Sequence, residues 1–354
     1  MPLANFTNLD FNQVKTTLRE YLKENSNFTD YDFEGSNLST ILDVLAYNTY
    51  ITSYNANMVA NEVFIDSATL RENVVSLARN IGYLPKSRKA ATATITFFVD
   101  TSNISSNPAT LTLKKGPVAT SAGGFGGSSF VFSILEDITV PVNDGIAEFN
   151  NISIFEGSLL TANFTYSARN PNAKFILDNI GIDTELMTVK VKGNELSTKL
   201  ETYVRQDSLF DVKPDSYVYY LQEVDDERYQ VIFGDNLFGR KLEDSNYVIV
   251  DYITSNGESA NGVGQFSFAG RLEDAQGSVI TSGISLMTTV LTARGGEEIE
   301  GVESIKKFAP RIYASQNRAL TANDYESLIP TKIYPETESI SVFGGEELVP
   351  PQYG

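Results

Sequence analysis

The chain has 354 residues and a formal net charge of -18, and it contains no Cys, His or Trp. These absences exclude disulfides, thiol nucleophiles, zinc–thiolate sites and imidazole acid–base chemistry. The negative charge repels phosphate backbones and so disfavours nucleic acid as a ligand. No window reaches the ~18 consecutive apolar residues of a membrane span, and the N-terminus does not resemble a signal peptide. The composition predicts a globular protein that is made and kept in a cytoplasm, without membrane insertion.

The first 85 residues predict a helical module. A first helix begins after Asp10, a plausible N-cap, and carries an apolar stripe. A second, long helix is expected over residues 36–64. A third is expected from about residue 66 to Gly82, a typical helix-ending glycine, with Pro85 just beyond it. The stripe of the first helix comprises Phe11, Val14, Leu18, Tyr21 and Leu22.

The second helix contains a stretch, residues 44–61, without any charged residue. An exposed helix normally carries charges on its outer face, so this stretch predicts a helix that other elements cover. Two apolar stripes follow helical spacing. The tyrosine stripe comprises Val44, Tyr47, Ile51, Tyr54 and Met58, and the valine stripe, expected on the opposite side, comprises Leu38, Ile41, Leu45, Val59 and Val63. We expect the valine stripe to pack on the first and third helices and the tyrosine stripe to bind a partner helix. An ordinary three-helix bundle explains the pattern equally well.

From residue 90 the apolar period changes to two, as in Ala93, Ile95, Phe97 and Val99, which indicates a β region. Turn signals such as Asp144-Gly145 separate the runs that follow. Strands are expected at residues 110–113, 130–134, 138–142, 187–191, 217–221, 229–233, 247–254 and 285–292. The sequence therefore predicts a multidomain α+β protein with mainly antiparallel β domains. Its expected parts are a helical module at 1–85, β domains at 86–175 and 176–270, and a β return with short helices at 271–354.

Two further segments have local interpretations. The glycine-rich loop at 123–127 lacks the Gly-Lys-Ser/Thr sequence of a phosphate loop and is typical of a flexible surface loop. Near the C-terminus, a short helix with a kink at Pro310 is followed by a helix that starts at Thr321, with Asp324 as its capping-box partner. Residues 340–343 resemble a strand with nothing after it to pair with.

Acidic clusters at 225–227 and 297–300 are the only candidates for carboxylate catalysis or metal binding. Glycosidase carboxylates must face a sugar from two sides, whereas adjacent residues of a strand point to opposite faces. Chance clusters are also expected among 45 acidic residues. We therefore expect no catalytic residue, metal, cofactor or small-molecule ligand, and solvated turns at both clusters.

Several motifs, taken in order, resemble one family. They are LARNIGYLP at 77–85, FGDNLFG at 233–239, Asn-Gly pairs at 256–257 and 261–262, RGGEE at 294–298, Ala-Pro at 309–310, QNRA at 316–319 and TANDYE at 321–326. This set resembles the baseplate J-like family of contractile phage tails, and within it the N-terminal portion of the baseplate wedge subunits of T-even-type phages. The motif glycines have structural roles in turns, with positive φ expected at Gly234, Gly239 and Gly257 and a helix end at Gly82. They are Gly82, Gly234, Gly239, Gly257, Gly295 and Gly296.

The resemblance implies a structural subunit of the virion, without enzymatic activity. It would join other wedge proteins and a second copy of itself into a ring around the tail hub, and would relay the change that triggers sheath contraction. Because such subunits usually continue into a further α/β region, the chain is expected to be truncated at Gly354. The alternative is a β-rich receptor-binding or polysaccharide-cleaving tail protein, although exposed aromatics around an acidic cleft and a parallel repeat are not evident.

Overall fold

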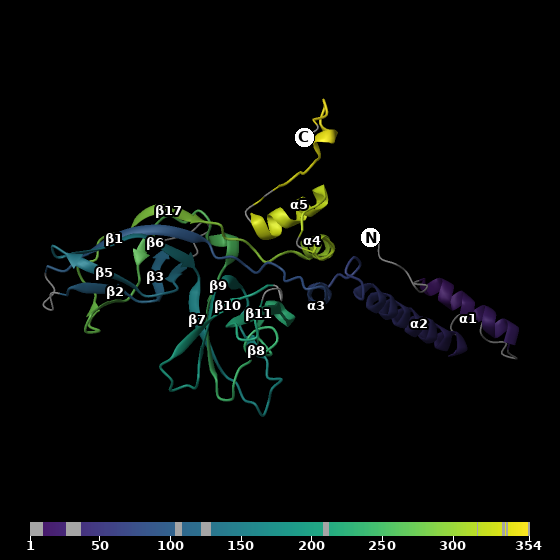
Figure 1. Cartoon of the computed structure of the whole chain (residues 1–354). Helices are drawn as coiled ribbons and strands as arrows, with labels where there is room; N and C mark the ends of the chain where they lie inside the picture. Colours follow the sequence, from purple (N-terminus) through teal and green to yellow (C-terminus); the bar gives the residue numbers. More distant parts are fainter. Residues whose placement is uncertain are drawn as a thin grey trace. The chain divides into compact units, whose positions relative to one another are not determined.

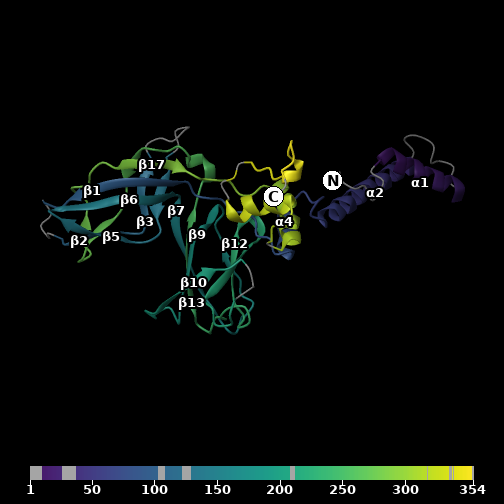
Figure 2. The same cartoon turned by 45° about the horizontal axis from the view of Figure 1, so that its top comes forward.

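The computed structural model describes residues 10–25, 37–102, 108–121, 129–207, 212–316, 318–334, 337 and 339–352. The predicted helix start at residue 36 and the glycine-rich loop at 123–127 lie outside these described residues. The chain divides into two compact units. The first comprises Met1–Tyr83, Val302–Leu328 and Gly344–Gly354, and the second comprises Leu84–Gly301 and Ile329–Phe343. Helices form the first unit and mainly antiparallel sheets the second, which confirms the α+β class (Figures 1 and 2).

The first unit draws its helices from both ends of the chain. They are α1 (Phe11–Asn25), α2 (Asn37–Glu62), α3 (Arg71–Asn80), α4 (Val302–Ser315) and α5 (Ala322–Leu328). Figure 1 shows α1 lying along α2. The first three helices do not form the ordinary three-helix bundle that was the alternative interpretation, since α3 packs against α4. Their shared core is closed by Ala68, Val74, Val75, Ala78, Tyr83, Ile305 and Ala309.

Capping interactions set several helix ends in this unit. The Asp10 carboxylate accepts the backbone N–H groups of Asn12 and Gln13, so its predicted N-cap role is confirmed. The capping box is also confirmed, since the Asp324 carboxylate accepts the Thr321 N–H at 2.8 Å and the Thr321 hydroxyl accepts the Asp324 N–H at 3.3 Å. The third helix begins at Arg71 rather than near residue 66, because the Glu62 carboxylate holds the preceding turn through Thr69.

The second unit contains two sheets, whose pairs are antiparallel except for β10 with β11. The ten-stranded sheet contains β1 (Thr92–Asp100), β2 (Thr110–Leu113), β3 (Gly116–Ser121), β4 (Val131–Ile134), β5 (Ile138–Asn143), β6 (Ile146–Glu156), β14 (Phe266–Phe268), β15 (Leu272–Asp274), β16 (Val279–Ile280) and β17 (Thr288–Arg294). The seven-stranded sheet contains β7 (Ser158–Thr165), β8 (Phe175–Leu177), β9 (Ile182–Lys192), β10 (Leu200–Arg205), β11 (Val218–Glu223), β12 (Tyr229–Phe233) and β13 (Tyr247–Thr254), in the order β7-β13-β9-β10-β11-β12-β8.

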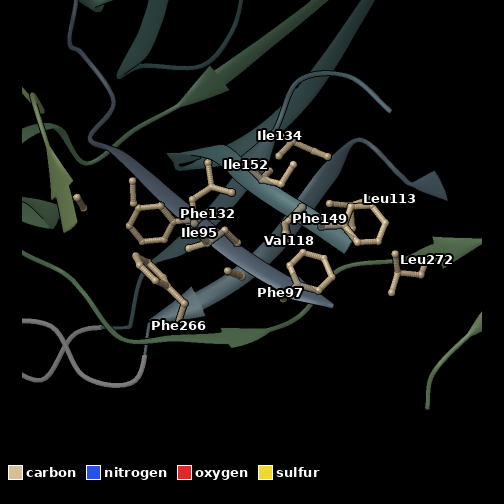
Figure 3. Close-up of a cluster of buried hydrophobic side chains, with 14 of the residues drawn as sticks. Ile95, Phe97, Leu113, Val118, Phe132, Ile134, Phe149, Ile152, Phe266 and Leu272 are labelled. Atoms are coloured by element: carbon tan, nitrogen blue, oxygen red, sulfur yellow. The ribbon is translucent and has the colours of Figure 1, made fainter. Parts of the chain in front are cut away.

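Each sheet has its own apolar core. In the ten-stranded sheet the inward-facing alternate residues of β1 pack on β6 and on the returning strands (Figure 3). The rings of Phe97 and Phe149 stack at the centre of this core, with their centroids 4.7 Å apart. The core of the seven-stranded sheet is richer in tyrosine and includes Tyr203, Tyr219 and Tyr229. Neither core contains residues of the helical unit, so the β unit has apolar cores of its own that stabilise its fold.

A tight joint links the two sheets where β6 passes into β7. Gly157 stands between these strands with φ +121°, and a Cβ there would lie 2.2 Å from the Thr254 carbonyl oxygen. Only glycine fits such a close approach. The buried Glu156 carboxylate accepts the Ser255 hydroxyl at 2.7 Å and the backbone and side-chain N–H groups of Asn256 at 2.9 and 2.8 Å. The end of β6 is thereby tied to the segment that follows β13.

A second buried carboxylate, Asp183 at the start of β9, gives a prediction about pH. Burial raises the pKa of Asp183, against the lowering effect of the Ala90 and Glu185 N–H groups that it accepts. A carboxyl with a raised pKa in the folded state stabilises most below its ordinary pKa of about 4, and loses this contribution as pH rises. We expect the free energy of unfolding of the native chain, measured relative to Asp183→Asn, to fall between pH 4 and pH 7. Urea denaturation of both proteins checks this, and a constant difference would contradict it.

The strand expected at residues 340–343 is wrong, since these described residues adopt no regular secondary structure. An isolated strand is not stable without a partner ladder, and no neighbouring segment supplies one among the described residues. The alternating pattern of Ile340 and Val342 was therefore not sufficient evidence for a strand.

Candidate partner-binding surface

One side of α2 carries a buried seam, in which most side chains are small or polar. The buried residues of α2 are Ser39, Leu42, Ala46, Asn57 and Asn61, at helical spacing along one side. On α1, the side chains of Phe11, Val14, Leu18 and Leu22 are half-buried. An ion pair between Lys15 and Asp43 joins the two helices. The sequence interpretation missed this seam, although small residues that recur every three or four positions could have indicated close helix packing.

The tyrosine stripe lies on the exposed side of α2. Val44, Tyr47, Tyr54 and Met58 are 63%, 61%, 46% and 37% exposed, and Ile51 is half-buried. A single exposed apolar residue is normal on a protein surface, whereas a contiguous row is typical of an interaction site. The stripe is therefore a candidate surface for a partner helix, which would lay its own apolar face along these side chains.

The valine stripe does not pack on α1 and α3 as predicted. Ile41, Leu45, Val59 and Val63 are exposed, and Leu38 is half-buried. At 3.6 residues per turn the two stripes are separated by roughly a third of a turn, so they flank one side of the helix and do not oppose each other. The buried side of α2 is instead the side that carries the seam. Most of the large apolar side chains of α2 thus face outward.

The motif glycines serve turns and close contacts. Gly82, Gly239, Gly257 and Gly295 have positive φ values of +76°, +93°, +62° and +76°. Gly234 does not have the predicted positive φ, and glycine is needed there for a close backbone contact instead. A Cβ at Gly234 would lie 2.1 Å from the Gly239 carbonyl oxygen, so the two ends of this loop touch through their backbones. Gly296 similarly lies against Gly257, where a Cβ would be 2.4 Å from the carbonyl oxygen.

The acidic clusters are engaged in local structure. Residues Asp225–Glu227 form an exposed 3-10 turn (η1), in which Asp226 pairs with Arg228 at 3.4 Å. Glu298 pairs with Arg88 at 2.9 Å, and the Glu300 carboxylate accepts the Lys86 N–H at 3.0 Å. Within the part of the chain that the structure describes, no group of three acidic residues converges as a metal site would, and no helix is long and apolar enough to cross a membrane.

Two segments of the chain match family models of baseplate proteins. Residues 10–83 match the family "Baseplate wedge protein gp6-like, helical domain", and residues 321–354 match "Baseplate structural protein gp6, C-terminal domain I". The chain is 26% identical over 349 residues to the baseplate wedge protein gp6 of Enterobacteria phage T4. This similarity covers 94% of the chain, which spans about half, 51%, of the length of that relative.

A solved structure gives a weaker similarity. A chain in the cryo-EM structure of the anti-feeding prophage baseplate, six-fold symmetrised, aligns over 94% of this chain and 66% of its own length, with 14% identity and a TM-score of 0.31. A score this low does not establish a shared fold. The broader baseplate J-like name stays a prediction. The chain is thus similar to baseplate wedge proteins in its two matched segments and, at 26% identity, over most of its length.

Proposed function

We propose that this chain is a structural subunit of a contractile phage tail baseplate, and that it joins other wedge proteins through the exposed tyrosine stripe of α2. The observation that carries this proposal is the position of the stripe. It lies within residues 10–83, the segment that matches the gp6-like helical domain, and it exposes large apolar side chains in a stretch without charge. The function therefore rests on packing and needs no catalytic group.

The energetics favour association through this helix. Full burial of an exposed large apolar side chain contributes ~1.5–3 kcal/mol, and each of these five partly buried side chains would supply the share of this that its remaining exposed surface allows. Outward charges, which would have to be desolvated, are absent from residues 44–61. The α1–α2 pair alone leaves this surface in water, and a bundle with a foreign helix would cover it.

The family resemblance extends the proposal to a role in the virion. The chain would help to close a ring of wedges around the tail hub and relay the change that triggers sheath contraction, together with a second copy of itself. It would be assembled in the host cytoplasm, would bind no nucleic acid, and would have no enzymatic activity. The pairing of the acidic clusters with Arg88, Arg228 and the Lys86 N–H supports their structural use.

The test is assembly with the other wedge proteins of the same phage. The full chain is co-expressed with each of these proteins in turn and purified through a tag on the chain, and native mass spectrometry gives the composition of the complex. We expect a stable complex with at least one wedge protein, whose mass also gives the copy number. Recovery of the chain alone in every combination would contradict the proposed function.

A further inference from the structure

The outer edge of β7 pairs with no other strand among the described residues, although β3 and β4 lie close to this strand. β7 is the first strand of the seven-stranded sheet and pairs only with β13, in an unbroken register from Ser158 to Thr165. Natural edge strands are commonly protected from other chains by charge, proline or a bulge. The sequence of β7, SLLTANFT, contains no charged residue and no proline, and its register with β13 has no shift.

Hydrogen bonds at the two ends of β7 show which backbone groups face outward. The Tyr166 N–H donates to the Asn246 carbonyl, toward β13, whereas the Gly157 N–H donates to the Val131 carbonyl on the other side. Backbone groups alternate in direction along a strand. Leu159, Thr161, Asn163 and Thr165 therefore direct their N–H and C=O groups away from β13. Within the described part of the chain, no other strand pairs with this edge.

The two faces of β7 also suit an added strand. Leu160, Ala162 and Phe164 pack on the core of the sheet and are only partly buried, so an apolar face continues to the edge. On the other face, Thr161, Asn163 and Thr165 are exposed. Opposite Thr161, the Asp251 carboxylate is buried and paired with Lys115 at 2.8 Å, so it presents no free charge to an incoming strand.

We infer that β7 pairs antiparallel with β7 of a second copy of this chain, around a two-fold axis at Ala162. In this register Thr161 lies opposite Asn163 of the other copy, and Leu159 lies opposite Thr165, so every outward N–H and C=O group finds a partner. Leu160 meets Phe164 on the apolar face, and Ala162 meets its own counterpart. No like charges are brought together, which matters for a chain with a net charge of -18.

This inference deepens the proposed function, in which a second copy takes part, but it uses a surface separate from α2. A second β7 suits this edge for three reasons. Its outward N–H and C=O groups match those of the first copy, its apolar side chains lie on the same face, and neither strand carries a charge. A closed two-fold contact also ends with two copies, since each strand has a single free edge.

A single cysteine tests the pairing, because the native chain has none. Residues opposite each other in a pair without mutual hydrogen bonds have Cα atoms about 4.5 Å apart, within reach of a disulfide. Full-length Ala162→Cys, oxidised with diamide over a range of protein concentrations, should form a covalent dimer that a reductant reverses. Thr202→Cys is the matched control, since Thr202 is exposed on the central strand β10 of the same sheet. Cross-linking no greater than in this control would overturn the inference.

Two further arms make the result specific. Asn163→Lys, added to the cysteine variant, places a charge on the exposed edge and should lower the dimer yield at least tenfold without changing the melting midpoint. In the unmodified chain, hydrogen exchange at Thr161, Asn163 and Thr165 should slow as protein concentration rises. Protection that requires a different wedge protein would show a foreign strand on this edge and overturn self-pairing. Cross-linking should persist when Tyr47 and Tyr54 are both changed to Asp, so that failure here and failure of the proposed function are distinguishable.

Discussion

Replacing Tyr47 and Tyr54 together by Asp should abolish co-purification with the partner wedge protein while the chain stays folded. Both side chains are exposed and lie one above the other on α2, seven residues apart. In a bundle, each carboxylate would be buried among apolar side chains without a partner, which costs several kcal/mol. We expect at least a 100-fold loss of affinity, equivalent to about 2.7 kcal/mol. Pull-down and the thermal denaturation midpoint are measured on the same preparation.

The control for this experiment lies on the same helix. Thr49→Asp with Ala56→Asp introduces the same charges at the same seven-residue spacing, at exposed positions outside the tyrosine stripe. This variant should retain the partner, because its carboxylates stay in water. Exposed substitutions usually change stability by less than about 0.5 kcal/mol, so neither variant should shift the midpoint appreciably. If the tyrosine variant keeps its partner, or if it unfolds the whole chain, the stripe is not the docking surface.

The second large effect concerns the core of the ten-stranded sheet. Phe97→Ala should lower the free energy of unfolding of the β unit by ~3–5 kcal/mol, since the residue is 1% exposed and its ring stacks on Phe149. Its neighbour Phe98 is 50% exposed on the opposite face of β1, so Phe98→Ala should cost less than about 1 kcal/mol. Calorimetry of both variants compares the same chemical deletion one residue apart. Equal losses would show that the alternation along β1 does not decide burial.

Local patterns in the sequence were sufficient for much of this fold. The apolar period of two predicted the strand β1, and the structure shows its alternating burial. The capping residues Asp10 and Thr321 predicted two helix starts, and their capping hydrogen bonds are present. The absence of charge in α2 predicted a covered helix, whereas both of its apolar stripes are largely exposed in this chain. The sequence could not decide which side of α2 is buried, because the choice depends on which segments of the folded chain pack against the helix.

Long-range partners were beyond such reasoning. The pairing of α3 with α4 joins residues from opposite ends of the chain, and nothing in the local pattern near Val74 specifies Ile305 as its neighbour. β7 was not predicted as a strand, although Leu160, Ala162 and Phe164 alternate with polar residues in its sequence. Its position at the edge of a sheet is a property of the strand order, which a single sequence does not reveal.

The origin of one helical core from two distant segments has a consequence for synthesis. During translation α3 is synthesised well before α4. The core that buries Val74 and Ala78 also needs Ile305 and Ala309, so it cannot form until α4 has been made. Since domains usually fold during synthesis, the sheets would form while the apolar face of α3 is still exposed to solvent. Nascent chains that stall before α4 should therefore be the ones that chaperones retain. The docking of α4 on α3 would therefore follow the formation of the sheets.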